Sequence, residues 1–443
     1  MKKQLFLIIA IINVAIILVL FNGCKLTSPD FDPNVIRDKI YEPTAVKYPT
    51  LEPHLVLYLD HSTCVIDANS NSPVFKALKG QLGLYTDTLC LIKGGNLVYV
   101  PNAEKSATST DVFNIINEIR DDIPYSDIGQ AVNNICNGNS KAILITDCEY
   151  YDKNKRNQDG SPYLTAPFIK WLKKGYVIYI VTEPYQEKLN GKIFDKKRFY
   201  FLFTDDKMDA PSTHLFMDLQ PLFEEGICQL FKLTNSDISV KPEGNLVSKE
   251  ISSTCQSFND FNYIAIDDDW SSIREFVMKL DEYGNPLPEE EPLPLIDNLI
   301  FNDGENYVIT DVKIEATNIT AQYLALEDSG ITAKVIDMSQ GFEIDQDALQ
   351  KNKLTVFLTK KIFDYLTDEY GGNLIRLDFV VTGAKLKSYE EEVFMWQSVD
   401  RNTQQATCVA KSIENALYDM SVVPMTNNRR VIHTVFIKTE AYK

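Results

Sequence analysis

Catalytic motifs built on histidine or glycine are missing from this 443-residue sequence. Only four histidines occur, none of them in an HExxH pattern, and no CxxC pair gives the ligand spacing of a zinc site. Nucleophile elbows of the Gly-x-Ser-x-Gly type and glycine loops that would cradle a phosphate are absent as well. The sequence therefore favours a protein that works by binding and is not an enzyme.

Basic residues are outnumbered by acidic ones. The chain carries 62 Asp and Glu against 44 Lys and Arg, a formal net charge of −18 at pH 7. This excess opposes contact with phosphate groups, so no nucleic-acid partner is expected. Hydrophobic residues make up 44% and charged residues 24% of the chain, which excludes a wholly disordered protein and a polytopic membrane protein.

Length and charge distribution both indicate two domains. The chain exceeds the roughly 250–300 residues at which a single hydrophobic core stops growing. Residues 51–235 hold 19 basic and 23 acidic residues, a balance of −4, whereas residues 236–443 hold 19 and 35, a balance of −16. We expect one domain over each of these ranges, the second with the more strongly solvated surface.

The N-terminus has the features of a secretory signal. Two lysines precede an apolar stretch over 5–21, and Gly23 stands before Cys24. This ending resembles the lipobox of bacterial lipoproteins, in which the cysteine becomes lipidated and forms the new N-terminus. Residues 1–23 are then a signal peptide, and 24–50, with four prolines and no hydrophobic periodicity, an irregular lipid-anchored tether. The alternative is an uncleaved membrane anchor; both place the protein in the cell envelope, outside the cytoplasm.

Short apolar runs and amphipathic helical patterns alternate along residues 51–235. Strands are predicted over 55–59, 142–146, 176–181 and 199–203, with a strand pair around Gly94 and Gly95, and helices over 73–79, 128–136 and 166–174. This alternation predicts an α/β fold with a doubly wound, mostly parallel sheet of the Rossmann type. Helices should cover both faces, and ligands should bind at the carboxyl ends of the strands.

Oxygen-bearing side chains stand at those strand ends. Asp60 and Ser62 follow the first strand, Ser126 opens the helix over 128–136, and Asp147 follows the strand over 142–146. A hard cation such as Mg²⁺ takes about six oxygens, typically one or two carboxylates with hydroxyls and waters. These four residues are therefore candidate ligands of Mg²⁺ or another divalent cation, with a coordination position left for an incoming acidic group.

Over about residues 51–225 these features resemble the von Willebrand factor A-type domain. That family holds its cation in a metal-ion-dependent adhesion site made from Asp-x-Ser-x-Ser after the first strand, a Thr-x-x-Gly-x-Ala-Leu helix start and a later strand-terminal Asp-Gly. The resemblance implies capture of a protein partner that bears an acidic group. The matched positions are Asp60, Ser62, Ser126, Gly129, Ala131 and Asp147.

Other functions stay open on the sequence alone. Asp60 and Asp147 could cap loops, and Ser126 a helix, in a domain without metal that serves as a structural scaffold of an envelope complex. A Cys/His hydrolase would use Cys148 as its nucleophile and His61 as its base. Neither residue is followed by the small residue that such a peptidase would have there, so we rank this function last.

Two cysteines stand where the resembled family has other residues. Cys64 replaces the second serine of the first motif, and Cys148 replaces the glycine after Asp147. Because both follow strand ends that should converge on one crevice, we expect Cys64 and Cys148 to approach each other and to be able to form a disulfide in an oxidising compartment.

Alternating, β-branched segments replace the helix–strand pattern after residue 235. Strands are predicted over 263–266, 307–316, 319–326, 331–336, 354–358 and 374–382, then a helix over 400–420 and a last strand over 431–438. This spacing predicts an antiparallel, β-sandwich-like domain. One face of the helix should pack into its core; that face carries Ala406, Val409, Ala410, Ile413 and Leu417.

If Cys24 carries the lipid anchor, Cys24→Ser should release the protein from membranes or leave it as an unprocessed precursor, because the modified thiol is gone. Mass spectrometry and membrane partitioning of both proteins check this. Unchanged mass, processing and partitioning would exclude lipidation at this cysteine.

Overall fold

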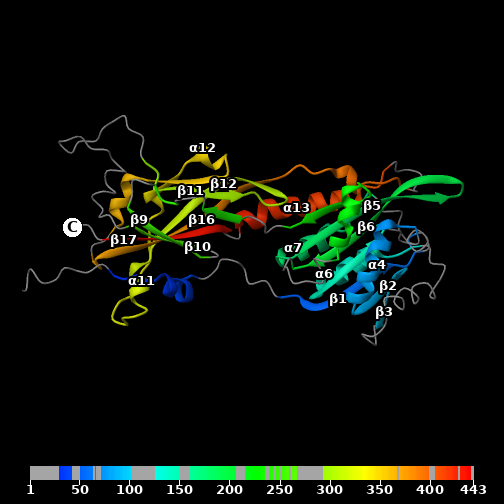
Figure 1. Ribbon diagram of the computed structural model, residues 1–443, viewed down its shortest axis with the longest axis horizontal. Coiled ribbons are helices and arrows are strands. Elements are labelled where there is room, and N and C mark those ends of the chain that lie inside the picture. The colour runs from blue at the N-terminus through cyan, green and yellow to red at the C-terminus, as the bar shows by residue number, and fades with distance from the viewer. Residues whose placement is uncertain are drawn as a thin grey trace, which may run out of the picture.

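The computed structural model arranges the chain as two units along the long axis of the molecule (Figure 1). We call residues 51–235 the first unit and residues 236–443 the second unit. Cys24, Cys64 and the apolar stretch over 5–21 lie outside the residues that the structure describes. Those residues are 29–41, 50–62, 65, 71–101, 125–149, 160–205, 215–234, 239–242, 246–248, 252–258, 261–266, 293–366, 369–398, 405–427 and 430–440.

A seven-stranded sheet forms the centre of the first unit, in the order β3-β2-β1-β4-β6-β5-β7. The continuous apolar runs predicted as buried strands form β1 and β4, which lie side by side in its middle. The strands are β1 (Glu52–Asp60), β2 (Thr88–Lys93), β3 (Asn96–Pro101), β4 (Ser140–Thr146), β5 (Val177–Leu189), β6 (Lys192–Thr204) and β7 (Gln229–Leu233).

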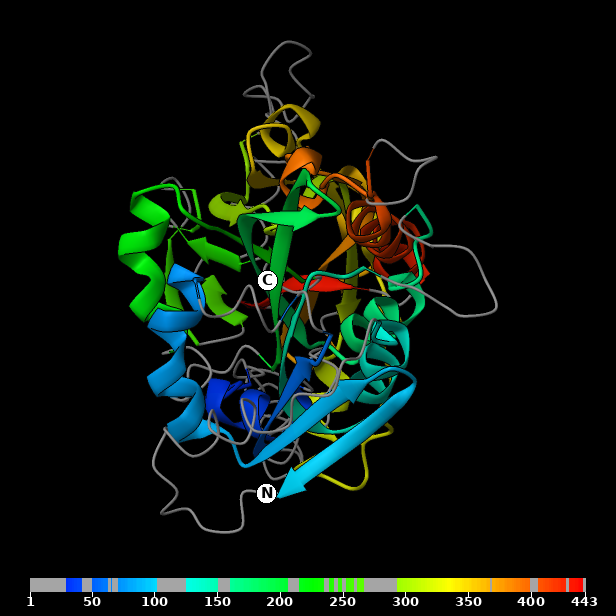
Figure 2. The ribbon, with the colours of Figure 1, turned by 90° about the vertical axis from the view of Figure 1, so that its right-hand side faces the viewer.

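Helices cover both faces of this sheet, as the alternation predicted (Figure 2). One face packs against α4 and the consecutive turns η2 and α9, and the opposite face packs against α6 and α7. The bounds are α4 (Pro73–Tyr85), α6 (Ile128–Asn137), α7 (Thr165–Lys173), η2 (Met217–Leu219) and α9 (Gln220–Glu224). Burial on both faces explains why β1 and β4 are apolar without alternation.

The expectation of a mostly parallel sheet is wrong. Among the described strands, β1 pairs in parallel with β2 and with β4, whereas the other four neighbouring pairs are antiparallel. One cause is a two-residue turn at Asn190 and Gly191, whose φ angles of 50° and 77° reverse the chain into a hairpin. Strand β6 therefore returns between β4 and β5, and the first unit is α/β with a mixed sheet.

Two sheets make up most of the second unit, in the orders β13-β12-β16-β17-β10-β9 and β14-β15-β11-β8. They share one hydrophobic cluster, which includes Phe301 and Val356 of the smaller sheet and Leu377 and Val435 of the larger one. The described strands pair antiparallel except β10 with β17. The bounds are β8 (Ser239–Pro242), β9 (Ser253–Ser257), β10 (Phe261–Ile266), β11 (Ile296–Asn302), β12 (Tyr307–Asn318), β13 (Ile336–Asp337), β14 (Phe342–Ile344), β15 (Lys353–Leu358), β16 (Gly372–Leu386) and β17 (Val431–Glu440).

Two strands predicted in this unit are not formed as expected. Residues 319–326 contain the short helix α11 (Thr320–Leu324), and of 331–336 only Ile336 belongs to a strand. Asn318 explains the first error, because its buried Oδ1 accepts hydrogen bonds from the amide and the hydroxyl of Thr320, at 3.0 and 2.6 Å. This local turn ends β12 and begins the helix. The remaining short helical turns are η3 (Ser339–Gly341), α12 (Gln346–Leu349), η4 (Lys360–Asp364) and η5 (Glu391–Phe394).

The segment predicted as an irregular tether contains helical structure in its described part. The turns α2 (Pro33–Val35) and η1 (Ile36–Ile40), the latter a π-helix, lie against the second unit (Figure 1). Phe31, Ile36 and Ile40 are buried in a cluster with residues of β10, β16 and β17. The Tyr263 hydroxyl donates to the Phe31 carbonyl at 2.9 Å. Residues 29–41 are therefore part of the folded body.

A long C-terminal helix, α13 (Cys408–Asn427), joins the two units. The predicted start at residue 400 is wrong, because Ala406 forms an antiparallel bridge with Trp396 and the helix begins at Cys408; the residues of the predicted apolar face are nevertheless buried, in a hydrophobic cluster that continues from α6 and α7 into both sheets of the second unit. The Ser412 hydroxyl accepts a hydrogen bond from the Leu164 amide at 3.2 Å, at the start of α7. In the part of the chain that the structure describes, no helix is both long and apolar enough to cross a membrane.

His433 on β17 should make stability depend on pH. Burial lowers the pKa of His433 from 6.5 to about 4, and its Nε2 lies 2.7 Å from Asn262 Oδ1. Because the folded state prefers the neutral ring, the contribution of His433 to the free energy of unfolding is complete above pH 6.5 and is lost as the pH falls from 6.5 toward 4. A shift of this size corresponds to about 3 kcal/mol. Urea unfolding measured across this pH range should show the loss of stability. His433→Gln should reduce this loss, whereas His54→Gln, at a more exposed ring, should leave it unchanged. Equal pH slopes in all three proteins would contradict it.

Candidate functional site

Folding brings the four residues predicted at strand ends to one place. Asp60 is the last residue of β1, and Asp147 follows β4 directly. The two strands are parallel neighbours with Leu59 opposite Ile145, so both carboxylates lie at the same edge of the sheet. The side chains of Ser62 and Ser126 lie close enough to interact with Asp60, and the charge of Asp147 acts on it.

Hydrogen bonds from the neighbouring backbone and from Thr146 orient Asp60. Its Oδ1 accepts from the Ser62 amide at 2.9 Å, and its Oδ2 accepts from the Thr146 hydroxyl at 2.8 Å. The Thr146 hydroxyl also accepts from the Cys148 amide at 2.9 Å. Thr146 is a member of the site that the sequence argument missed, although it stands next to Asp147 at the end of an apolar strand.

Ser126 is not the cap of the helix that follows it, which corrects the alternative interpretation of this residue. Asp127 is the N-cap of α6 and accepts from the Gln130 amide at 2.9 Å. Ser126 instead forms a parallel bridge with Gly94, and its hydroxyl donates to the Ile92 carbonyl at 2.9 Å. These contacts leave its side chain beside Asp60.

Asp147 has its own set of donors. Its Oδ1 accepts from the Glu149 amide at 3.0 Å, and its Oδ2 accepts from the Tyr185 hydroxyl at 3.3 Å. Tyr185 comes from the hairpin strand β5, which the sequence argument ended at residue 181. Cys148, between Asp147 and Glu149 in the chain, has a φ angle of 58°, in the left-handed region that favours glycine.

Burial and like charge shape the electrostatics of the site. Asp60 and Asp147 are each 1% exposed and Ser62 is 4% exposed. Burial, followed by the charge of Asp147, raises the pKa of Asp60 to about 6. The same two causes raise the pKa of Glu187. A divalent cation would oppose these shifts, because it favours the ionised carboxylates.

Further charges lie beside Asp147 on the hairpin. The fully buried Lys196 forms an ion pair with Glu149, and its Nζ lies 3.6 Å from Glu187 Oε2. Lys196 thus pairs with two of the acidic residues in this region. Nothing in the spacing of the sequence indicated this arrangement, because it depends on the hairpin folding back over the end of β4.

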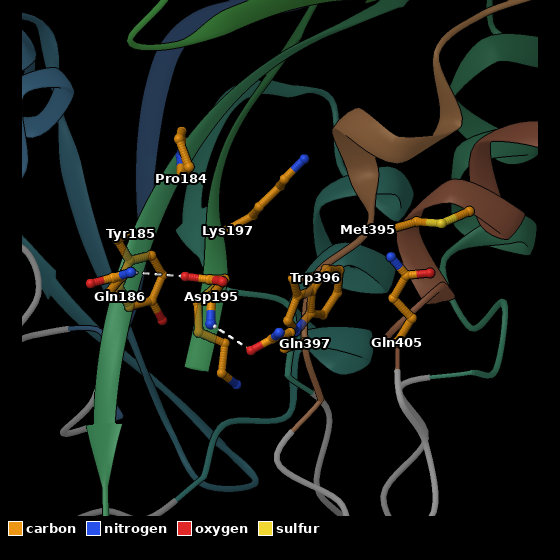
Figure 3. A pocket seen from close by; sticks show the side chains of 10 residues that line it. Pro184, Tyr185, Gln186, Asp195, Lys197, Met395, Trp396, Gln397 and Gln405 are labelled. Carbon is orange, nitrogen blue, oxygen red and sulfur yellow. Dashed lines mark hydrogen bonds between the residues drawn. The ribbon is translucent and has the colours of Figure 1, made fainter. Parts of the chain in front are cut away.

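A cavity of about 480 Å³ adjoins the site (Figure 3). It lies between the hairpin and the segment of the second unit around Trp396, whose ring centroid is 5.4 Å from that of Phe199. The Gln397 amide donates to the Asp195 carbonyl at 2.9 Å across this boundary. Tyr185 lines the cavity and its hydroxyl contacts Asp147, so this residue borders both the cavity and the candidate site, whereas none of the four candidate ligands lines the cavity.

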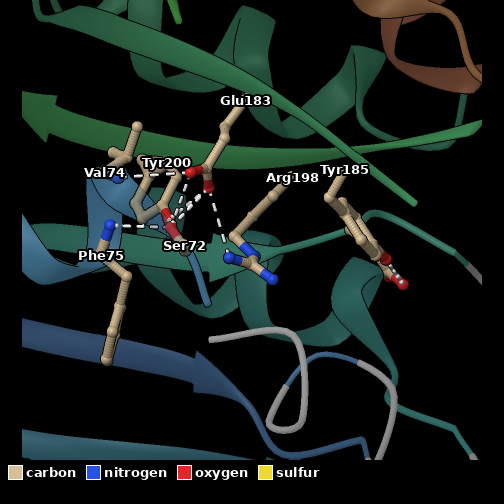
Figure 4. Close-up of polar contacts among 8 residues, drawn as sticks. Ser72, Val74, Phe75, Glu183, Tyr185, Arg198 and Tyr200 are labelled. Atoms are coloured by element: carbon tan, nitrogen blue, oxygen red, sulfur yellow. Dashed lines mark hydrogen bonds and ion pairs between the residues drawn. The ribbon is translucent and has the colours of Figure 1, made fainter. Parts of the chain in front are cut away.

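A buried ionic network lies on the same strands (Figure 4). Glu183 accepts from the Ser72 hydroxyl at 2.6 and 2.7 Å, from the Tyr200 hydroxyl at 3.0 Å and from Arg198 Nη1 at 3.3 Å. Ser72 is the N-cap of α4. The Arg198 guanidinium lies 5.1 Å from the centroid of the Tyr185 ring. The network therefore ties α4 to the hairpin that carries Tyr185.

The remaining predicted residues are only partly described. Cys64 lies outside the described residues, so its expected approach to Cys148 stays a prediction. Cys148 is fully buried, and burial followed by Cys408 raises the pKa of its thiol well above the usual value. His61 is buried as well.

The donor set at this place is two carboxylates with hydroxyl oxygens. Within the described residues, no group of three or more His, Cys, Asp or Glu side chains is arranged to hold a metal ion. The oxygen set that is present fits Mg²⁺ better than a softer metal, because hard cations prefer carboxylate and hydroxyl ligands.

Comparison with known proteins adds no relative. No family model, no curated protein and no solved structure matches this chain.

Glu183→Gln should destabilise the protein by about 3–5 kcal/mol, because it leaves the buried Arg198 charge uncompensated. Glu224→Gln, at an exposed carboxylate on α9, is the matched control and should change stability by less than ~0.5 kcal/mol. Urea unfolding of the three proteins measures both. Equal free energies of unfolding for the two variants would show that Glu183 does not stabilise this network.

Proposed function

We propose that the protein is a non-enzymatic binding protein of the cell envelope. It holds Mg²⁺ or another divalent cation at Asp60, Ser62, Ser126 and Asp147 and captures a protein partner through an acidic group. The observation that carries this proposal is the convergence of these four side chains, from three separate segments, on the edge formed by β1 and β4.

Three features support the finer assignment to a von Willebrand A-like domain. The sheet has helices on both faces, and its central strands β2, β1 and β4 are parallel. The oxygen ligands stand at the carboxyl ends of β1 and β4 and before α6. Cys148 has a positive φ at the position where the resembled family has glycine, so the loop has the shape that a glycine would allow.

Access to the cation would be through the neighbouring cavity. The carboxylates are 1% exposed, and Tyr185 both lines the cavity and contacts Asp147 through its hydroxyl. In our proposal the acidic group of the partner replaces the Tyr185 hydroxyl near Asp147 and occupies the open coordination position.

The proposed anchor at Cys24 would keep the protein near a membrane, outside the cytoplasm. Phe31 is already buried in the second unit, a few residues after Cys24. An extended chain covers ~3.5 Å per residue, so the folded body would lie within a few tens of Å of the lipid surface. The second unit would therefore face the membrane at short range.

A metal-free scaffold is the second candidate function. It is favoured by the hydrogen bonds that the carboxylates already accept, from Ser62 and Thr146 to Asp60 and from Glu149 and Tyr185 to Asp147. These bonds satisfy part of the hydrogen-bonding capacity of the carboxylate oxygens without a cation. The Cys/His hydrolase is the weakest alternative, because burial keeps the Cys148 thiol protonated and away from substrate.

Calorimetric titration of the protein with Mg²⁺, Mn²⁺ and Ca²⁺ tests the cation site. The wild type should bind at least one of these cations. Asp60→Asn and Asp147→Asn should each weaken binding by on the order of 100-fold or more, because each removes one of two carboxylates.

Asp218→Asn is the matched control, since this aspartate contacts Gln81 on the helical face away from the strand ends. It should bind as the wild type does. Equal cation affinity in all four proteins, or no binding by the wild type, would contradict the cation site and favour the metal-free scaffold.

A further inference from the structure

Two buried cysteines meet where the units join. Cys148 follows β4 and Asp147, and Cys408 is the first residue of α13. Both are fully buried, and Cys408 Sγ lies 3.8 Å from the carbonyl oxygen of Cys148. They are 260 positions apart in the sequence, so only the packing of α13 against the first unit brings them together.

The backbone at Cys148 is unusual. In the part of the chain that the structure describes, three residues other than glycine have a positive φ: Cys148, Asn190 and Asn352. Asparagine tolerates the left-handed region because its short polar side chain can bond locally, whereas cysteine gains no such compensation. Such a conformation persists where the surroundings hold it: the Cys148 amide donates to the Thr146 hydroxyl at 2.9 Å, and its carbonyl accepts from the Tyr163 hydroxyl at 3.1 Å, which keeps residue 148 in place beside α13.

We propose that Cys148 and Cys408 form a disulfide that fastens the loop after Asp147 to the first turn of α13. The reaction is thiol–disulfide exchange: the two thiols lose their protons, one S–S bond forms, and the two electrons pass to the disulfide of an oxidised donor, which leaves as two thiols. The donor is an oxidoreductase or a small-molecule disulfide. The proposal rests on the proposed function only for the oxidising compartment that would supply this donor.

The other described cysteines are less suited to pairing with Cys148. Cys90 lies within the first sheet, Cys136 on α6, Cys228 before β7 and Cys255 on the edge strand β9. Among the described cysteines, Cys408 is the one whose sulfur contacts Cys148, through the carbonyl oxygen of that residue. The bond would hold the loop of the candidate cation site, in the first unit, to α13 of the second unit.

Burial also determines when the bond forms. A fully buried thiol is out of reach of a disulfide donor, so exchange needs the transient opening of the α13 contact or occurs while the chain folds. The full-length protein in detergent should therefore be incubated in a mixture of reduced and oxidised glutathione with a low concentration of urea. It is then denatured, its remaining thiols are alkylated, and the digest is mapped by mass spectrometry without reduction.

We expect one cross-linked peptide pair that contains Cys148 and Cys408, with the other described cysteines alkylated. In Cys408→Ser, Cys148 should become alkylated, whereas Cys136→Ser, the matched control, should keep the cross-link. The oxidised wild type should melt a few degrees above the reduced protein, and this difference should disappear in Cys408→Ser. Alkylation of both cysteines in the wild type, or a bond from Cys148 to Cys64, would overturn the proposal.

This experiment is independent of the cation and of export. Its readout needs neither bound metal nor membrane attachment, so a protein that fails to bind Mg²⁺ or is found in the cytoplasm can still form the bond in glutathione. Conversely, a chain that binds the cation but leaves Cys148 and Cys408 alkylated would refute the disulfide alone.

Discussion

The packing of α13 between the two units is the constraint on which the rest of the arrangement depends. Its buried face belongs to one hydrophobic cluster that runs from α6 and α7 of the first unit into both sheets of the second. The free energy gained by burying apolar side chains is proportional to the area removed from water. A shared cluster of this extent therefore couples the units into one folded body. The cavity beside Tyr185 and the contact between Cys148 and Cys408 exist only because the units are held in this register.

The first unit concentrates charge at one buried place. Two carboxylates at the ends of β1 and β4 lie close enough for one to raise the pKa of the other, while the ionic network around Glu183 fixes the hairpin behind them. Burying charge is unfavourable unless partners compensate it, and here hydroxyls, backbone amides and basic residues do so in part. The same chemistry suits a divalent cation, which is why a metal-binding function and a metal-free scaffold are both reasonable for this geometry.

The hairpin of β5 and β6 shows how a local signal can change a topology. Asn190-Gly191 is a strong sequence signal for a two-residue turn, and with it the apolar run at 199–203 should have been paired back onto β5. The inserted strand β6 adds antiparallel pairs to the sheet, and the hairpin supplies Tyr185 from β5 and Lys196 and Arg198 from β6 to the surroundings of the site. The buried turn at Asn318 had a similar effect in the second unit, where it replaced a predicted strand by α11.

Local pattern alone determined the buried strands β1 and β4, the helices α4, α6 and α7, the apolar face of α13 and the presence of Asp60, Ser62, Ser126 and Asp147 at segment ends. These are properties of short stretches, because strand and helix periodicity and strand termination are encoded within a few residues. Tertiary structure decided which strands are neighbours, that residues 29–41 pack on the second unit, that Tyr185 and Thr146 complete the site, and that Cys148 meets Cys408. Such contacts join residues far apart in the chain, and they depend on the summed burial of whole surfaces, which no local pattern records.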